Sequence, residues 1–369
     1  MHKRIFSRMA TALFLWATLA GCAKDKSEAV EYYQLADFRA VPKIDAHVHM
    51  NTGGEAFVKL AAENNFRLLT INVDYPDFPP IAEQLAVARG LLAAAPERVA
   101  FVSTFSMNGW GEPEWLGETE RHLDQTFADG ALGVKVWKNI GMAFRDANGE
   151  NVMIDDPGFD PLFAFIKSRG KVLVGHQGEP KNCWLPAEEM TVNNDREYFK
   201  NHPQYHMYQH PEEPSYEEHM AARDRMLAKN EGLPFMGAHL ASLEWSVAEL
   251  AKFLDRFPNA VVDMAARMGQ VQYQSAHDRE AVRNFLIQYQ DRILYATDLT
   301  HGAEEDPEAF AGAALAKWQA DWRYLVSDDQ MEVPEVNGPF QGLKLPKSVV
   351  DKLYAGNARR IFPGAFSGS

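Results

Sequence analysis

Short apolar stretches alternate with longer segments of helical periodicity along most of this chain. The apolar stretches are rich in β-branched residues, and eight of them have the length and flanking residues of strands. These stretches begin near Lys43, Arg67, Val99, Leu132, Lys171, Pro234, Ala260 and Arg292. Strands that alternate with helices are typical of a parallel sheet, and eight is the number found in a closed barrel. The pattern therefore predicts an α/β fold, a (β/α)8 TIM barrel.

The segments between the strands carry apolar residues at helical spacing. Two such sets are Ile81, Leu85, Ala88 and Leu92, and Leu243, Val247, Leu250 and Leu254. Each set gives its helix one apolar stripe that can pack on the sheet.

One spacing between strands is much longer than the others, the one from Lys171 to Pro234. It predicts an insertion after strand 5, at about residues 180–230, some 30 residues longer than usual loops. The insertion is rich in histidine and tyrosine: His202, Tyr205, His206, Tyr208, His210 and Tyr216. It is either a lid over the barrel mouth or a solvated surface excursion that ends in an amphipathic helix.

Polar and ionisable residues stand where several predicted strands end. They are Asp45, His47, His49, Lys135, His176, His239, Asp263 and Asp298. In a TIM barrel the C-terminal strand ends and the loops that follow them form the active-site face. We therefore expect these scattered residues to meet at one mouth.

His47 and His49 are two apart on a strand, so both point to the same side, where two imidazoles can bind one cation. Such a pair is weak evidence alone, because most pairs of this kind are ordinary strand histidines. Three further ionisable residues at later strand ends change this picture: His176, His239 and Asp298. Burying them together without a partner costs several kcal/mol per group, and a divalent cation removes that cost.

With these residues the chain resembles the amidohydrolase superfamily, in its amidohydrolase-2 branch of aminocarboxymuconate semialdehyde decarboxylase-like enzymes. The resemblance runs from about Lys43 to Phe362. It rests on the strand Asp45-Ala46-His47-Val48-His49, on the three later residues, and on the closing Tyr354-Ala355-Gly356-Asn357-Ala358-Arg359-Arg360-Ile361-Phe362. The resemblance implies metal ligands at His47, His49, His176 and Asp298, and catalytic roles for Asp298 and His239.

The implied cofactor is one divalent metal, with Zn²⁺ as the default and Mn²⁺ or Fe²⁺ as alternatives. Asp298 would take a proton from a metal-activated water, and His239 would polarise the substrate oxygen or protonate the leaving group. Lys135 resembles the carbamylated lysine of members with two metals, which leaves a second metal open, and either Lys135 or Lys138 could point inward. Asp45 would orient a ligand histidine or cap a turn.

Two further residues are candidates for substrate binding. Arg267 follows the seventh strand and can hold a carboxylate, and Trp137 follows the fourth strand. The leading functional hypothesis is a metal-dependent hydrolase that uses a metal-activated water on an ester, lactone or amide of a small organic molecule. A non-oxidative decarboxylase of a small carboxylic acid is the alternative on the same site. A surface lipoprotein that binds without catalysis is a third interpretation.

The composition of the chain limits the kinds of partner that it can bind. The 369 residues carry a formal net charge of -14 without any run of lysine or arginine, which argues against nucleic acid as a partner. The partners expected are a small-molecule substrate and a membrane, reached through an N-terminal lipid anchor. The oligomeric state stays open.

The N-terminus predicts that anchor. Residues 1–22 have a basic start, an apolar run from Met9 to Ala20, and the sequence Leu19-Ala20-Gly21-Cys22, which resembles the lipobox of bacterial lipoproteins. We expect a signal peptide at 1–22 with lipidation of Cys22, a tether at 23–40 and the barrel domain at 41–369. Ala23 resembles the residue found in lipoproteins sorted to an outer membrane, with the protein facing the periplasm.

Overall fold

The structure is a computed structural model that describes residues 30–366. The predicted signal peptide, the lipidation site Cys22 and the first part of the predicted tether lie outside these residues. The described residues from Glu31 onward form a compact unit of their own. Among the described residues no helix is both long and apolar enough to cross a bilayer.

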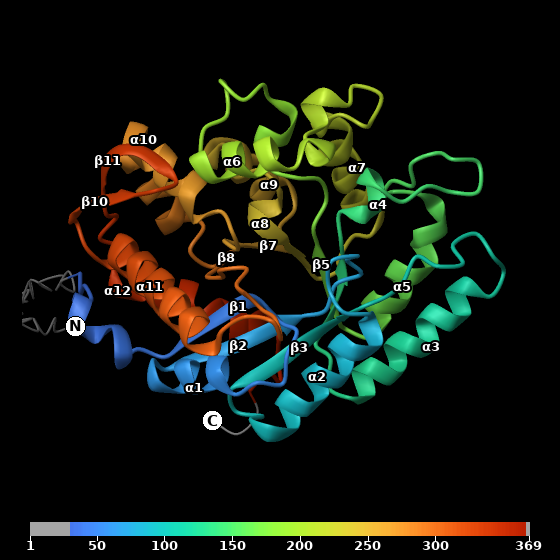
Figure 1. The fold of residues 1–369 in the computed structure, drawn as a ribbon, viewed down its shortest axis with the longest axis horizontal. Helices are drawn as coiled ribbons and strands as arrows, with labels where there is room; N and C mark the ends of the chain where they lie inside the picture. Colours follow the sequence, from blue (N-terminus) through green and yellow to red (C-terminus); the bar gives the residue numbers. More distant parts are fainter. Residues whose placement is uncertain (1–29, 367–369) are drawn as a thin grey trace, which may run out of the picture. The chain divides into compact units, whose positions relative to one another are not determined.

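Nine parallel strands form one sheet in the order β8-β7-β6-β5-β4-β3-β2-β1-β9 (Figure 1). They are β1 (Lys43–Met50), β2 (Phe66–Ile71), β3 (Val99–Thr104), β4 (Gly133–Val136), β5 (Val172–Gly175), β6 (Phe235–Gly237), β7 (Ala260–Asp263), β8 (Ile293–Leu294) and β9 (Thr300–His301). Each of the eight predicted strands begins within one residue of an observed strand. The TIM-barrel prediction is therefore confirmed.

The expected eighth strand is divided into β8 and β9 by an irregular stretch. Within this stretch the Asp298 amide donates to the His47 carbonyl (2.9 Å), and the His49 amide donates to the Leu299 carbonyl (2.8 Å). Asp298 itself has a positive φ of 69°, which regular strand geometry excludes. Because β8 pairs with β7 while this stretch and β9 bond to β1, the sheet closes on itself.

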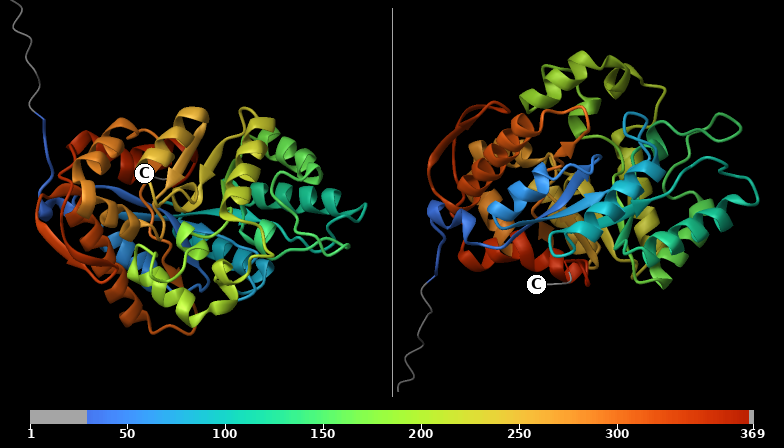
Figure 2. Two further views of the ribbon diagram at one scale, coloured as in Figure 1. Left: turned by 90° about the horizontal axis from the view of Figure 1, so that it is seen from above. Right: turned by 60° about the horizontal axis from the view of Figure 1, so that its bottom comes forward.

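Helices cover the outer face of the sheet (Figures 1 and 2). The longer ones are α1 (Ala56–Glu63), α2 (Ile81–Ala94), α3 (Trp115–Ala128), α5 (Asp160–Ser168), α9 (Val247–Arg256), α10 (Met268–Gln288) and α11 (Pro307–Val326). Shorter ones are α4 (Asn139–Met142), α8 (Ala238–Ala241), α12 (Lys347–Asp351) and α13 (Asn357–Ile361). Leu85 and Ala88 of α2 are buried as expected, whereas Leu243 lies before α9, which begins after its N-cap Ser246.

The strands bury both faces, as expected for a parallel barrel. One cluster fills the barrel interior, with Ile44, Leu69, Val102 and Val174 among its members. Phe362, near the C-terminus, belongs to the same cluster. A larger cluster lies between the sheet and the surrounding helices. This two-sided packing makes the barrel a rigid support for the strand ends.

A β-bulge in β1 changes which side chains face the interior. The register of β1 against β2 shifts between Asp45 and Val48. Ile44 and Ala46 belong to the interior cluster, but beyond the shift Val48 packs in the outer one. The extra residue of a bulge turns following side chains to the other face, so Asp45 and His47 do not share a side.

The prediction that Asp45 orients a ligand histidine is therefore wrong, and Asp45 instead bonds across to the stretch after β8 and to α11. The Asp45 carboxylate accepts from the amide (2.9 Å) and hydroxyl (2.6 Å) of Thr297 and from the Trp318 indole (3.0 Å). It thereby secures the residue that precedes Asp298.

The folded part of the chain begins before residue 41. Residues Leu35–Arg39 form a 3-10 helix, η1, in which Phe38 is buried. The Phe38 ring lies 6.1 Å from Phe66 and 6.0 Å from Trp322, and the Lys43 ammonium donates to the Phe38 carbonyl. The last residues of the predicted tether are thus packed against the barrel.

The β5–β6 segment, residues 176–234, lies at the top of Figure 1. It contains η3 (Lys181–Trp184), α6 (Asn193–Asn201), η4 (Pro203–Tyr205), η5 (Met207–Gln209) and α7 (Tyr216–Lys229). Ser215 and Glu218 form a capping box that starts α7. The segment contacts a hairpin that the sequence did not predict, β10 (Gln330–Val333) and β11 (Val336–Gln341), through the Asn193 amide and the Glu335 carbonyl (2.9 Å).

Candidate metal centre

Three side chains of types that can bind a metal converge at the C-terminal mouth of the barrel. His47 and His49 come from β1, and Asp298 comes from the stretch between β8 and β9. Asp298 Oδ1 lies 3.2 Å from His49 Nε2 and 3.4 Å from His47 Nε2. Among the described residues this is the group whose ligand atoms all lie within 4.8 Å of one another.

Both histidines are held in the tautomer that a metal requires. His47 Nδ1 bonds to Asp263 Oδ2 (2.8 Å) and His49 Nδ1 bonds to the Ile71 carbonyl (2.7 Å). A carbonyl and a carboxylate can only accept, so each Nδ1 carries the proton and, in the neutral ring, each Nε2 keeps its lone pair.

Three electron-pair donors, two Nε2 atoms and one carboxylate oxygen, therefore face one another. Asp298 Oδ1 is buried and has no hydrogen-bond partner among residues 30–366. Ligands about 2.1 Å from a tetrahedral zinc ion lie about 3.4 Å apart, which agrees with the observed separations. The arrangement fits a divalent cation.

The charge state of His47 supports this fit. Burial lowers its pKa, the Lys135 ammonium lowers it further, and Asp263 acts in the opposite direction. The net shift favours the neutral imidazole, which is the form that binds metals.

His176 and His239 lie beside the three-residue group without belonging to it. Their rings are 4.1 Å apart, and the His239 ring is 5.1 Å from that of His47. His176 Nε2 is buried without a hydrogen-bond partner, while His239 Nδ1 bonds to the Ala265 carbonyl (2.9 Å). Burial holds the pKa of both imidazoles well below the usual value, and neighbouring charged groups such as Lys135 and Arg267 contribute to the lowering. Both rings are therefore neutral.

An unusual turn positions His239. Four consecutive residues, His239 to Ser242, have φ between 54° and 58°, so the segment labelled α8 turns in the left-handed sense. This conformation costs about 1–2 kcal/mol per non-glycine residue and persists only where the surroundings impose it. The Ser242 hydroxyl donates to the Gln177 carbonyl (2.9 Å), which helps to hold the turn.

Asp263 connects these histidines, a role that sequence reasoning missed. Its second oxygen, Oδ1, accepts from the amides of His239 (2.8 Å) and Ala265 (3.1 Å). Burial raises its pKa, but His47, His239 and Lys135 outweigh burial, so the pKa is lowered and the carboxylate stays charged. The signal in the sequence that could have indicated this role is the position of Asp263 at the end of a predicted strand.

The structure decides between the two lysines near β4. Lys135 is buried, and its Nζ lies 3.3 Å from His47 Nε2. Burial lowers its pKa to about 8, although Asp263 and Asp298 act in the opposite direction. Lys138 follows the strand end and forms an ion pair with Glu179. Lys135 is the lysine that faces the metal-binding group.

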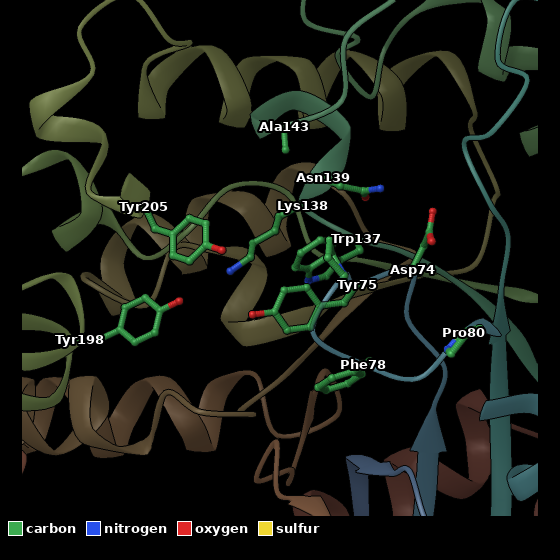
Figure 3. Close-up of a pocket in the computed structure, with 11 residues that line it drawn as sticks. Asp74, Tyr75, Phe78, Pro80, Trp137, Lys138, Asn139, Ala143, Tyr198 and Tyr205 are labelled. Atoms are coloured by element: carbon green, nitrogen blue, oxygen red, sulfur yellow. The ribbon is translucent and has the colours of Figure 1, made fainter. Parts of the chain in front are cut away.

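The two candidate substrate-binding residues lie apart. Arg267 is 8% exposed, its Nη1 donates to the Ala266 carbonyl (3.2 Å), and its Nε has no hydrogen-bond partner. Its charge acts on His176 and His239. Trp137 lines a separate cavity of about 520 Å³ (Figure 3).

Comparisons with known proteins place this chain among its relatives. No curated protein matches it. An uncharacterised TIM-barrel protein from Bordetella bronchiseptica is similar in structure at 16% identity and a TM-score of 0.50, over 88% of this chain and 99% of that one. A 2,6-dihydroxybenzoate decarboxylase from Rhizobium is similar at 13% identity and a TM-score of 0.51, over 87% of this chain and 98% of that one. The sequence model of the amidohydrolase family matches residues 44–364, so this chain belongs to the amidohydrolase family of metal-dependent enzymes.

Proposed function

We propose that this protein hydrolyses an ester, lactone or amide bond in a small organic molecule. The observation that carries the proposal is the convergence of His47 Nε2, His49 Nε2 and Asp298 Oδ1, three electron-pair donors with no proton between them. His176, whose buried Nε2 has no partner, is the proposed fourth ligand. Zn²⁺ is the proposed cation, with Mn²⁺ and Fe²⁺ as alternatives.

These residues would hold a divalent cation, which when bound would supply a Lewis acid for a substrate carbonyl and for a water. The protein's own groups handle the protons. The Asp298 carboxylate, with 28% of its side chain exposed at the mouth, accepts a proton from the attacking water. Because the Nδ1 proton of His239 is committed to the Ala265 carbonyl, its Nε2 acts as an acceptor and must be protonated before it can give a proton to the leaving group.

Lys135 offers two arrangements. As a buried amine with a pKa lowered to about 8, it can lose its proton more easily than an exposed lysine and could be carbamylated to bind a second metal. We favour a single metal, with the Lys135 ammonium stabilising negative charge that develops on the substrate.

Decarboxylation of a small carboxylic acid is the second candidate. Arg267 supports it, because this buried guanidinium has no carboxylate within ion-pair distance among the described residues and its Nε lacks a hydrogen bond. A substrate carboxylate would supply an ion-pair partner for the guanidinium and a hydrogen-bond acceptor for its Nε.

The experiment combines metal analysis with product analysis. Protein purified without added metal should carry about one equivalent of metal, which the His47→Ala/His49→Ala double variant should lose. The metal-loaded protein is then tested on a panel of esters, lactones, amides and carboxylic acids. Release of acid without carbon dioxide, lost in Asp298→Asn, would support hydrolysis. Carbon dioxide release without ester, lactone or amide turnover would favour the decarboxylase instead.

We also propose that Cys22 is lipidated and anchors the protein to a bacterial membrane, with the outer membrane facing the periplasm as the expected place. The supporting observation is the sequence Leu19-Ala20-Gly21-Cys22. Expressed in a bacterium with two membranes, the protein should be found in the outer-membrane fraction with an acylated Cys22 at its N-terminus by mass spectrometry. Finding wild-type protein in the soluble periplasmic fraction would contradict the anchor.

A further inference from the structure

The cavity beside the metal-binding group is walled by aromatic rings from three parts of the chain (Figure 3). Tyr75 and Phe78 follow β2, and Trp137 follows β4. Tyr198 and Tyr205 belong to the β5–β6 segment, in α6 and η4. The cavity volume of about 520 Å³ lies within the range of small-molecule sites.

One wall of this aromatic cavity is in contact with the metal-binding group. The Phe78 ring lies edge to face against the His49 ring, with 5.1 Å between ring centroids. Tyr75 lies 5.1 Å from Phe78 and 4.5 Å from Trp137, so the three rings form a continuous surface that leads away from the metal centre. The cavity and the metal-binding group are therefore joined by the contact between Phe78, which lines the cavity, and His49.

Three polar side chains in the cavity wall already have partners. Lys138 is paired with Glu179, and the Tyr75 hydroxyl donates to Asp77 (2.5 Å). Asp74 accepts from the Met107 amide (3.4 Å), and burial raises its pKa. The surface that remains for a ligand consists mainly of ring faces and edges, with tyrosine hydroxyls at the side formed by Tyr198 and Tyr205 (Figure 3).

We propose that this cavity binds a neutral aromatic ring of the substrate, next to the bond that is cleaved at the metal centre. Aromatic pairs in offset or edge-to-face geometry gain energy beyond the burial of apolar area, which favours a planar ring over an aliphatic ring of equal size. Because the Lys138 ammonium is paired with Glu179, the wall offers no unpaired cation to a negatively charged ring. The statement that a bond is cleaved beside the ring rests on the proposed function. The binding of an aromatic ring in the cavity does not.

The β5–β6 segment then contributes to substrate selection, because it supplies two of the five rings. Tyr198 and Tyr205 are 37% and 38% exposed, so their side chains are available to a ligand and replacing them removes little of the core. Tyr208, in the same segment, is 53% exposed and does not line the cavity. It provides a matched control.

The test measures binding separately from catalysis. Metal-loaded protein is titrated by calorimetry with benzamide and with cyclohexanecarboxamide, which present the same amide on a flat aromatic or a puckered aliphatic ring. We expect benzamide to bind about tenfold more tightly. The Tyr198→Leu/Tyr205→Leu variant should bind benzamide about five- to tenfold more weakly than wild type, as expected for lost aromatic contacts, and Tyr208→Leu should bind like wild type.

Equal affinity for the two amides would overturn the proposal, as would an equal loss of benzamide binding in Tyr208→Leu and in the double variant. Tighter binding of tetramethylammonium than of benzamide would also overturn it, in favour of a cation site. If benzamide binds as expected while no ester, lactone or amide is hydrolysed, the proposed function fails and the aromatic site stands. If hydrolysis occurs but benzamide and cyclohexanecarboxamide bind equally well, the proposed function stands and the aromatic site fails.

Discussion

Asp263 is the residue that links the candidate ligands to the rest of the barrel, since one carboxylate oxygen binds His47 Nδ1 and the other binds the His239 amide. Asp263→Asn keeps the shape but removes the charge that fixes the Nδ1 proton of His47. We expect metal affinity to fall by about 10- to 100-fold, the usual effect of losing such a partner. Competition with a chromophoric chelator measures the change.

The matched control is Asp321→Asn. Asp321 is also buried and accepts from the Tyr295 hydroxyl (2.9 Å), but it contacts no histidine. It should lower stability and leave metal affinity unchanged. Equal metal affinity in both variants would show that Asp263 does not act through His47.

Glu244 makes a pH-dependent contribution to stability. It is fully buried, one oxygen accepts from the Lys181 amide (2.8 Å), and the other has no partner. Burial raises its pKa from 4.5 to about 7, against the effect of Arg267. Between these values the folded state binds the proton more tightly than the unfolded state. The stability due to protonated Glu244 is therefore present below about pH 4.5 and is lost as the pH rises through about 7.

Glu244→Gln mimics the protonated form and should remove this dependence. The difference in free energy of unfolding between the variant and wild type should increase from pH 5 to pH 8, by an amount on the order of 1–3 kcal/mol in favour of the variant. Thermal midpoints at the two pH values measure the gain. Glu217→Gln, on the exposed face of α7, should shift both midpoints equally. A constant difference between Glu244→Gln and wild type would contradict the prediction.

At the scale of elements, the left-handed turn after β6 depends on a glycine before it. A Cβ at Gly237 would lie 2.5 Å from the Ala241 Cβ and 3.0 Å from its Cα. Gly237→Ala should therefore lower the free energy of unfolding by about 1–3 kcal/mol and displace His239. Denaturant unfolding measures the loss.

Gly90→Ala is the opposite case. Gly90 lies in α2, and no heavy atom lies within 4 Å of the position that an added methyl group would take. The higher helix propensity of alanine should therefore raise stability by up to about 1 kcal/mol. If both substitutions change stability in the same direction, a clash between the added methyl group at position 237 and Ala241 does not explain the effect of Gly237→Ala.

At the scale of the whole molecule, the N-terminal segment is part of the folded unit. Phe38 packs between β2 and α11 through Phe66 and Trp322. Phe38→Ala should reduce the free energy of unfolding by about 3 kcal/mol, as for other buried phenylalanines. Leu35→Ala, where the side chain is 46% exposed, should change it by less than about 0.5 kcal/mol. Similar midpoints for the two variants would place Phe38 in a tether.

The amino-acid sequence by itself determined the strand order and the place of the chemistry. Apolar runs of strand length, separated by helical stripes, predicted all eight barrel positions because local burial follows the period of each element. The polar residues at strand ends predicted a common mouth, since parallel strands end on one side. The convergence of His47, His49 and Asp298 follows from that rule.

The neighbours of these residues depend on contacts between distant parts of the chain, which local patterns do not reveal. The bulge in β1 separates the side chains of Asp45 and His47 onto different faces, and a period of two cannot reveal an extra residue. The partner of His47 turned out to be Asp263, more than 200 positions later, and the turn at His239 is left-handed against local preference. The rings of the aromatic cavity come from three separate connections between strands. Such contacts depend on closure of the barrel, whereas strands and helices depend on local sequence.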